Sequence, residues 1–153
     1  MPDEQDDGFA AFFADAEPRL RRALVAVYGP ERGRDAAAEA LAYAWQHWER
    51  VREMDNAVGY LYRVGQSKSR PRRAPVVFPP ALEVDAEWYE PDLPDALGRL
   101  SERERLAVVL VSGFGWTYRE VAELAGVSTS SVQSYLERGL DKLRAALGVS
   151  EDA

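Results

Sequence analysis

The stretch Thr117-Tyr-Arg-Glu-Val-Ala-Glu-Leu-Ala-Gly126-Val-Ser-Thr-Ser-Ser-Val-Gln-Ser-Tyr-Leu136 predicts two short helices joined by a tight turn. Thr117 can cap the first helix, and Glu120 three residues later completes a capping box. Gly126 lies where the chain turns and where φ can be positive, and Ser128 can cap the second helix. This pattern indicates a helix-turn-helix, whose second helix can lie in the DNA major groove; an ordinary helical hairpin is the alternative.

The apolar residues of this stretch recur at helical spacing and define a buried face for each helix. They are Val121, Leu124 and Ala125 in the first helix and Val132, Leu136, Leu140 and Leu143 in the second. The side chains expected to point outward from the second helix are Ser130, Ser131, Gln133, Ser134 and Arg138. That polar outward face is the one that would meet DNA.

The composition of the 153 residues suits one or two small domains with a substantial apolar core. There are no cysteines, which excludes disulfides and thiolate metal sites, and the single histidine cannot build an ordinary zinc site. The N-terminus is acidic rather than a basic signal segment, and no apolar run could span a membrane, so we expect a cytoplasmic protein. We expect no cofactor, no metal and no enzyme activity, because the sequence has neither a phosphate loop nor a nucleophile elbow.

The net charge of −7 is unusual for a protein that binds nucleic acid, because such proteins are usually basic. Much of the excess lies in residues 71–95, which hold six acidic and two basic side chains. Neither flanking part carries a strong basic patch. Binding of the chain alone to DNA should therefore be weak and sensitive to salt.

A first lobe of three helices is predicted upstream of this acidic segment. The first helix carries an apolar stripe from Phe9 to Val27, and Pro18 should kink it or start it afresh. The second runs from Arg34 to about Arg52. The third runs from Ala57, which Asn56 can precede as a cap, to about Lys68.

The segment 71–94 holds six prolines, so helix is not expected through most of it. Its acidic residues surround Trp88-Tyr89. A solvated tether is the default interpretation. The alternative is a tether that runs through a basic channel of a partner, where its charge mimics nucleic acid.

The second lobe should run from Asp95 to about Leu147 and open with a helix that has its own capping box, Ser101 and Glu104. The residues expected in its core are Leu106, Val109 and Leu110, and those expected to break it are Gly113 and Gly115. No alternating strand pattern occurs. The predicted fold class is therefore all-α, with two small helical domains joined by a Pro-rich acidic linker.

The motifs of both lobes together resemble the extracytoplasmic-function type of the sigma-70 family of bacterial RNA polymerase sigma factors. In the second lobe the similar stretches are Asp95-Ala-Leu-Gly-Arg-Leu-Ser-Glu-Arg-Glu-Arg-Leu, Gly115-Trp-Thr-Tyr-Arg-Glu-Val-Ala and Val132-Gln-Ser-Tyr-Leu-Glu-Arg-Gly-Leu-Asp-Lys-Leu-Arg. In the first they are Pro18-Arg-Leu-Arg-Arg-Ala-Leu, Asp35-Ala-Ala-Ala-Glu-Ala-Leu-Ala-Tyr-Ala-Trp45 and Asp55-Asn-Ala-Val-Gly-Tyr-Leu-Tyr-Arg-Val64. The resemblance implies an acidic disordered tail at 1–8, a region 2-like domain at 9–70, a linker at 71–94 and a region 4-like helix-turn-helix domain at 95–148.

The resemblance also implies a function: a sigma factor binds core RNA polymerase and directs transcription initiation at promoter DNA, and an anti-sigma factor is a further possible partner. The residues implied to contact the clamp of the polymerase largest subunit are Asp35, Glu39, Trp45 and Trp48. Those implied to approach the −10 promoter element are Arg63, Gln66, Ser67, Lys68, Arg70, Arg72 and Arg73. At the −35 element, the phosphate contacts would come from Thr117, Tyr118, Arg119, Arg138 and Lys142, and the base contacts from Thr129, Ser130, Ser131, Gln133 and Ser134. Gln133 is suited to bidentate pairing with adenine.

Several positions depart from the family pattern and make the DNA contacts degenerate. Gln66-Ser67 stands where an Arg-Asn pair is common, and Ala38 stands where a glutamine is frequent. Glu137 and Asp141 lie on a recognition helix that is usually basic. Two alternatives therefore stay open: a helix-turn-helix regulator of the response-regulator effector type, which Leu100-Ser-Glu-Arg-Glu also resembles, and a sigma-like interaction module without initiation activity.

Overall fold

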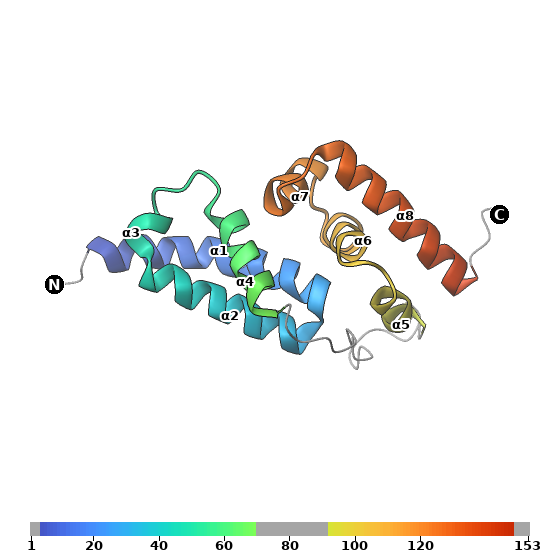
Figure 1. Ribbon diagram of the computed structural model, residues 1–153, viewed down its shortest axis with the longest axis horizontal. Coiled ribbons are helices and arrows are strands. Elements are labelled where there is room, and N and C mark those ends of the chain that lie inside the picture. The colour runs from blue at the N-terminus through green and yellow to red at the C-terminus, as the bar shows by residue number, and fades with distance from the viewer. Residues whose placement is uncertain (1–3, 70–91, 149–153) are drawn as a thin grey trace.

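The computed structural model describes residues 4–69 and 92–148, which form two packed helical lobes (Figure 1). The N-terminal lobe comprises α1 (Glu4–Tyr28), α2 (Pro30–Gln46), α3 (Trp48–Val51) and α4 (Ala57–Ser69). The C-terminal lobe comprises α5 (Leu93–Gly98), α6 (Glu102–Ala107), the π-helical segment η1 (Val108–Gly113), α7 (Tyr118–Ala125) and α8 (Thr129–Leu147). The described residues contain no strand, and the predicted all-α fold is confirmed. Most of the predicted linker lies outside the described residues.

The first helix begins earlier than expected and continues through Pro18. Its backbone is already helical at Glu4, so α1 overlaps the stretch that was expected to be a tail. Pro18 lies inside α1 and no fresh helix begins there. A proline removes a single backbone donor, and the fully buried Ala16 and Leu20 on either side hold the helix in the core.

The second helix begins earlier and ends earlier than predicted. Gly29 has a φ of 88°, which turns the chain, and Pro30 then takes the first helical position, where its missing N–H costs nothing. The helix stops at Gln46, and His47 separates it from the single turn of α3. The third predicted helix is confirmed as α4, and the Asn56 side chain accepts a hydrogen bond from the Gly59 amide at 3.0 Å.

The helices of the N-terminal lobe pack closely because small residues lie at their crossings. A Cβ atom on Gly33 would lie 2.4 Å from the Val25 Cα, so the backbones of α1 and α2 are in direct contact there. Leu20, Leu24 and Leu61 are fully buried among α1, α2 and α4. The lobe therefore has a dense core with little room for a larger side chain at position 33.

The local signals predicted for the C-terminal lobe are confirmed. Both capping boxes form, Ser101 with Glu104 and Thr117 with Glu120. Ser128 accepts a hydrogen bond from the Ser131 amide at 3.1 Å, and Gly126 ends α7 with a φ of 70°. The helix-turn-helix is thus built from the side-chain caps and the glycine that the sequence specifies.

The core face of the helix after Ser101 differs from its prediction. Leu106 and Leu110 are buried as expected, but Val109 is only half-buried and Val108 takes its place in the core. The change from α-helix to π-helix at Val108 widens the turn and rotates the later side chains around the axis. An apolar period read from sequence assumes 3.6 residues per turn and fails at such a point.

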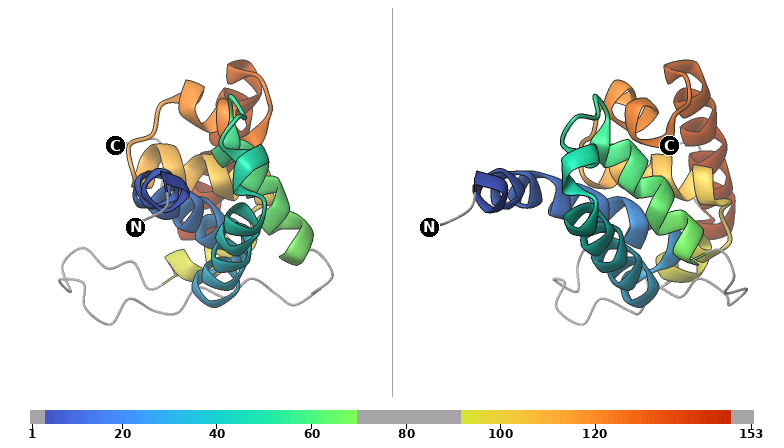
Figure 2. Two further views of the ribbon diagram at one scale, coloured as in Figure 1. Left: turned by 90° about the vertical axis from the view of Figure 1, so that its left-hand side faces the viewer. Right: turned by 60° about the vertical axis from the view of Figure 1, so that its left-hand side comes forward.

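The two lobes pack against each other, with α1 and α4 lying against α6 and α7 (Figure 2). Arg105 of α6 is only 2% exposed, and its guanidinium donates to the carbonyl oxygens of Ala26 at 2.8 Å and Val27 at the end of α1. The same group donates to the Leu100 carbonyl oxygen at 2.8 Å. Asn56 adds a hydrogen bond from its Nδ2 to the Glu123 carbonyl oxygen at 2.7 Å.

Arg105 therefore caps the C-terminal end of α1 from the other lobe. The last carbonyl groups of a helix have no intrahelical partner, and the helix dipole there favours a positive charge. The last turn of α1 contains no basic residue of its own. Burial lowers the pKa of Arg105, yet the surrounding carbonyl oxygens solvate the cation in place of water.

Candidate nucleic-acid interface

Helix α8 presents the polar face that the sequence predicts. Val132, Leu136 and Leu143 are buried, whereas the predicted base contacts lie at the surface, with Ser131 partly covered. The exposed residues of this group are Thr129, Ser130, Gln133 and Ser134. The Ser128 hydroxyl also lies within hydrogen-bonding distance of those of Ser130 and Ser131, at 3.0 and 2.9 Å. The first turn of α8 is therefore a compact cluster of hydroxyl groups at the positive end of the helix dipole.

The start of α7 supplies the other predicted phosphate contacts. Thr117, Tyr118 and Arg119 are all exposed, and Tyr118 retains 39% of its accessible surface. The Thr117 hydroxyl is engaged in its capping box, because it accepts from the Glu120 amide at 3.0 Å and donates to the Glu120 carboxylate at 3.0 Å. Tyr118 and Arg119 are better placed than Thr117 to reach a phosphate.

The charges along α8 alternate in sign and leave little net positive charge. Glu137 and Asp141 are exposed on the outward side of the helix, and Asp141 pairs with Arg144 at 3.4 Å. Lys142, a predicted phosphate contact, instead lies 2.7 Å from the Glu104 carboxylate of α6. Burial would raise the pKa of Glu104, but hydrogen bonds from Lys142 and from Ser101 outweigh it and hold that pKa below its usual value. Lys142 is thus engaged in an ion pair within the lobe, and a contact with DNA would have to compete with that pair.

A second basic group beside α8 was not predicted. The Arg103 side chain of α6 donates to the Tyr135 hydroxyl at 2.9 Å, and its guanidinium lies 5.6 Å from the centre of the Tyr135 ring. Arg138 lies 5.4 Å from the same ring. Among the ion pairs of the described residues, none involves Arg103 or Arg138. Tyr135 therefore holds two guanidinium groups at one edge of the recognition helix. The sequence did not predict this arrangement, because Arg103 and Tyr135 are 32 residues apart in the chain.

The predicted −10 contacts are only partly brought together. Arg63 and Ser67 lie one turn apart on α4 and are exposed, Lys68 is also exposed, and Gln66 is half-buried. Arg63 lies against the helix-turn-helix, because its Nη1 is 3.3 Å from the position of a Cβ on Gly126. The remaining candidates, Arg70, Arg72 and Arg73, lie outside the described residues.

An aromatic cluster beside Arg63 was missed by sequence reasoning. The hydroxyl groups of Tyr43 and Tyr60 lie 3.0 Å apart and join α2 to α4. The Arg50 guanidinium hydrogen-bonds to both hydroxyls, and the His47 ring stacks on Tyr43 with centroids 4.1 Å apart. The hydrogen bond with Tyr43, aided by burial, raises the pKa of Tyr60. Aromatic faces beside a guanidinium are the groups on which unpaired bases stack.

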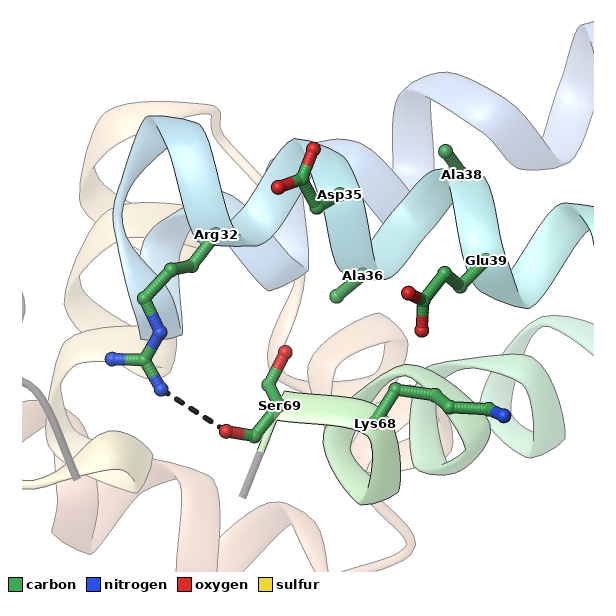
Figure 3. A pocket seen from close by; sticks show the side chains of 7 residues that line it. All are labelled: Arg32, Asp35, Ala36, Ala38, Glu39, Lys68 and Ser69. Carbon is green, nitrogen blue, oxygen red and sulfur yellow. Dashed lines mark hydrogen bonds between the residues drawn. The ribbon is translucent and has the colours of Figure 1, made fainter. Parts of the chain in front are cut away.

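Three of the four predicted clamp-binding residues, Asp35, Glu39 and Trp45, border two concave surfaces on α2. Asp35 and Glu39 line a polar pocket of about 230 Å³ with Arg32, Lys68 and Ser69, in which Arg32 donates to the Ser69 carbonyl oxygen at 3.1 Å (Figure 3). In Figure 3 the Glu39 carboxylate points toward α4, whereas Asp35 points away from it. Both acidic residues are exposed.

The second concave surface is an apolar groove of about 500 Å³ between α1 and α2. Phe9, Phe13, Leu41 and Trp45 line it, and Trp45 keeps 46% of its surface exposed. Trp48 differs, since it is only 6% exposed and packs against Phe9 and Phe12 with ring centroids 5.4 and 5.1 Å away. Trp48 is therefore a core residue that supports this surface, and the prediction that it contacts a partner does not fit its burial.

Comparisons with known proteins agree with the two-lobed, helix-turn-helix architecture. Residues 92–143 match the family described as Sigma-70, region 4. A 57-residue stretch is 41% identical to the RNA polymerase sigma factor CarQ of Myxococcus xanthus, and this stretch is 37% of the chain and 33% of CarQ. The match thus spans about a third of that relative's length.

A solved structure extends the likeness to nearly the whole chain. It is the sigma factor RpoE in complex with the anti-sigma factor NepR from Bartonella quintana. The TM-score is 0.68 at 19% identity, over 95% of this chain and 99% of RpoE. The C-terminal lobe is therefore a sigma-70 region 4 domain. The sigma-70 match covers this lobe, and the chain as a whole has the fold of that sigma factor. No helix within the described residues is both long and apolar enough to cross a membrane.

Proposed function

We propose that the chain is a sigma factor that binds core RNA polymerase in the cytoplasm and directs initiation at specific promoters. The observation that carries this proposal is the pairing of a region 4 helix-turn-helix with a second helical lobe that has its own exposed contact surfaces. A regulator of the response-regulator effector type would carry a receiver or ligand domain in place of that lobe. The two-lobed fold therefore favours a sigma factor.

In this proposal α8 reads the −35 element in the major groove. Tyr118 and Arg119 at the start of α7 contact phosphates on one side of the groove, and Arg138 contacts them on the other. Arg103, held beside Arg138 by Tyr135, is a further phosphate contact. The exposed residues of the first two turns of α8 approach the base edges, which carry the sequence information.

The N-terminal lobe opens and holds the −10 element. Arg63 and Ser67 on the exposed side of α4 approach the backbone, and Lys68 extends this basic edge. Tyr60 lies on the same side and offers its ring to bases that leave the duplex, and Tyr43, on which His47 stacks, holds the Tyr60 hydroxyl. The segment that contains Arg70, Arg72 and Arg73 would add positive charge directly after α4.

The surface of α2 docks on the polymerase clamp. Asp35 and Glu39 contribute exposed negative charge, and the groove around Trp45 accepts apolar side chains of the partner. An exposed aromatic residue at the rim of a groove is a typical anchor of a protein interface. An anti-sigma factor would compete for the same apolar surface, since RpoE, the sigma factor of similar fold, forms a complex with one.

Reconstitution with purified core RNA polymerase tests this function. We expect the full chain to co-purify with core polymerase and to give run-off transcripts from a subset of genomic promoter fragments. Replacing both Asp35 and Glu39 by alanine should weaken the complex, whereas replacing Glu53, an equally acidic and exposed residue of the same lobe, should not. Polymerase binding without any transcript would support the interaction module instead, and firm DNA binding without polymerase would support the regulator.

A further inference from the structure

Two acceptor side chains lie next to each other on the outward side of the recognition helix. Gln133 and Glu137 are one helical turn apart on α8 and both are exposed. The Gln133 Nε2 donates a hydrogen bond to the Glu137 Oε1 at 3.2 Å. None of the ion pairs within the described residues involves Glu137.

This hydrogen bond fixes which groups remain for a ligand. A glutamine amide has a donor side and an acceptor side, and a carboxylate has acceptors alone. One of the two N–H groups of the Gln133 amide is used by Glu137, so the Gln133 Oε1 and the Glu137 carboxylate oxygens outnumber the one amide N–H that remains. The pair therefore presents a surface that seeks hydrogen-bond donors.

The base edges of the major groove differ in the donors that they offer. Cytosine presents its N4 amino group, and adenine presents its N6 amino group beside the N7 acceptor. Guanine presents O6 and N7, and thymine presents O4, all of which are acceptors. The Glu137 carboxylate oxygens, beside the Gln133 Oε1, are repelled by guanine and thymine, and partly by adenine N7. Cytosine is the base that suits them.

We propose that the Gln133–Glu137 pair makes this chain select cytosine at one position of its −35 element. This inference rests on the proposed function and names the base chemistry of the same site. It also gives a role to the negative charge on α8, which otherwise only opposes binding. A carboxylate brought into the groove without an amino group opposite loses its water and gains no partner, so incorrect sequences are penalised.

The test is selection of DNA from a library with randomised −35 base pairs by the reconstituted holoenzyme. The wild-type chain should favour cytosine at one position by about tenfold over guanine and thymine. Glu137→Ala removes the carboxylate and leaves the Gln133 amide, which can pair with adenine through its Oε1 and Nε2. In this variant the preference at the same position should move from cytosine to adenine.

Asp141→Ala is the matched control, because it removes the same charge one turn further along α8. Both variants should bind DNA more tightly overall, since each removes a negative charge, but Asp141→Ala should keep the cytosine preference. A wild-type profile without a cytosine position overturns the inference, and so does an identical base profile for Glu137→Ala and the wild type. If the chain fails to bind core polymerase, the proposed function fails, and the same selection by the full chain alone at low salt still decides the base preference.

Discussion

Replacing Arg105 by methionine should destabilise the protein more than any other single change of a charged side chain in α6. The substitution keeps a long, unbranched side chain with good helix propensity and removes the guanidinium. It deletes the hydrogen bonds to Ala26 at 2.8 Å, to Val27 and to Leu100 at 2.8 Å. The carbonyl oxygens at the end of α1 then lose their partner in the core.

The expected loss follows from the number and kind of these bonds. A hydrogen bond to a charged group contributes roughly 1.5–3 kcal/mol. The guanidinium bonds to five carbonyl oxygens are lost, because Leu97 and Gly98 also accept from it, at 3.2 and 3.5 Å. Relief of the desolvation of a buried cation offsets part of this, as replacements of buried ion pairs by apolar residues indicate. We therefore expect a net destabilisation of about 2–4 kcal/mol, a large part of the roughly 5–15 kcal/mol that stabilises a protein of this size.

Urea and thermal unfolding followed by circular dichroism would measure the loss, with tryptophan fluorescence as a second probe. The midpoint temperature should fall by roughly 4–15 °C. Arg103→Met is the control, because Arg103 is exposed in the same helix and its change should stay within about 0.5 kcal/mol. Small-angle scattering should also show a larger radius for Arg105→Met, since the bonds to α1 join the lobes. If Arg105→Met unfolds like Arg103→Met, the buried guanidinium does not cap α1.

Three other substitutions test the remaining structural arguments. Gly126→Val places a branched side chain at a φ of 70°, with its Cβ 3.3 Å from Arg63, and should lower the free energy of unfolding by about 2 kcal/mol. Gly148→Val is the control, because it has a φ of 69° with open space around it, and it should lower the free energy of unfolding less. Equal losses of stability in the two variants would contradict the argument. Gly33→Ala should destabilise by about 2–3 kcal/mol because its Cβ would meet the Val25 backbone at 2.4 Å, whereas Gly113→Ala, with no contact closer than 3.9 Å, should be neutral or slightly stabilising in the same unfolding assay. Glu104→Gln should reduce stability at neutral pH, because the pKa of Glu104 is lower in the folded protein than in the unfolded chain. The carboxylate therefore stabilises the fold above about pH 4.3. This stabilisation is lost as the pH falls through the folded pKa. The difference in unfolding free energy between wild type and Glu104→Gln should therefore shrink as the pH falls below about 4.3, and a difference that is independent of pH would refute it.

The features that sequence predicted correctly are those set by neighbours in the chain. A capping box such as Thr117 with Glu120 closes between residues three apart, and Gly126 adopts a backbone conformation that its own lack of a Cβ permits. Such signals need no knowledge of the fold. For the same reason the helix-turn-helix and the polar face of α8 could be predicted with their boundaries.

The features that sequence did not predict depend on residues far apart in the chain. Arg105 caps a helix 78 residues earlier in sequence, and Tyr43 meets Tyr60 only after α2 and α4 have packed. Lys142 was expected at the phosphates because its charge lies on a recognition helix, but Glu104 from another helix engages it. Trp48 was expected to contact the clamp because the family resemblance implied it, yet it follows the break at His47 and lies in the core.

The charge pattern of α8 fixes how the proposed sigma factor can gain affinity for promoters. Each phosphate contact adds about 0.9 to the steepness with which the logarithm of the binding constant falls as the logarithm of the salt concentration rises. A helix with few available cations makes few such contacts and therefore gains little affinity from the DNA backbone. Lys142 is engaged by Glu104, and Glu137 and Asp141 repel phosphates. In the proposed function, linkage to polymerase replaces this missing affinity, because a tethered domain meets its site at an effective concentration near the millimolar range. Under that condition weak backbone contacts suffice, and base contacts such as those of Gln133 and Glu137 decide which promoter is bound.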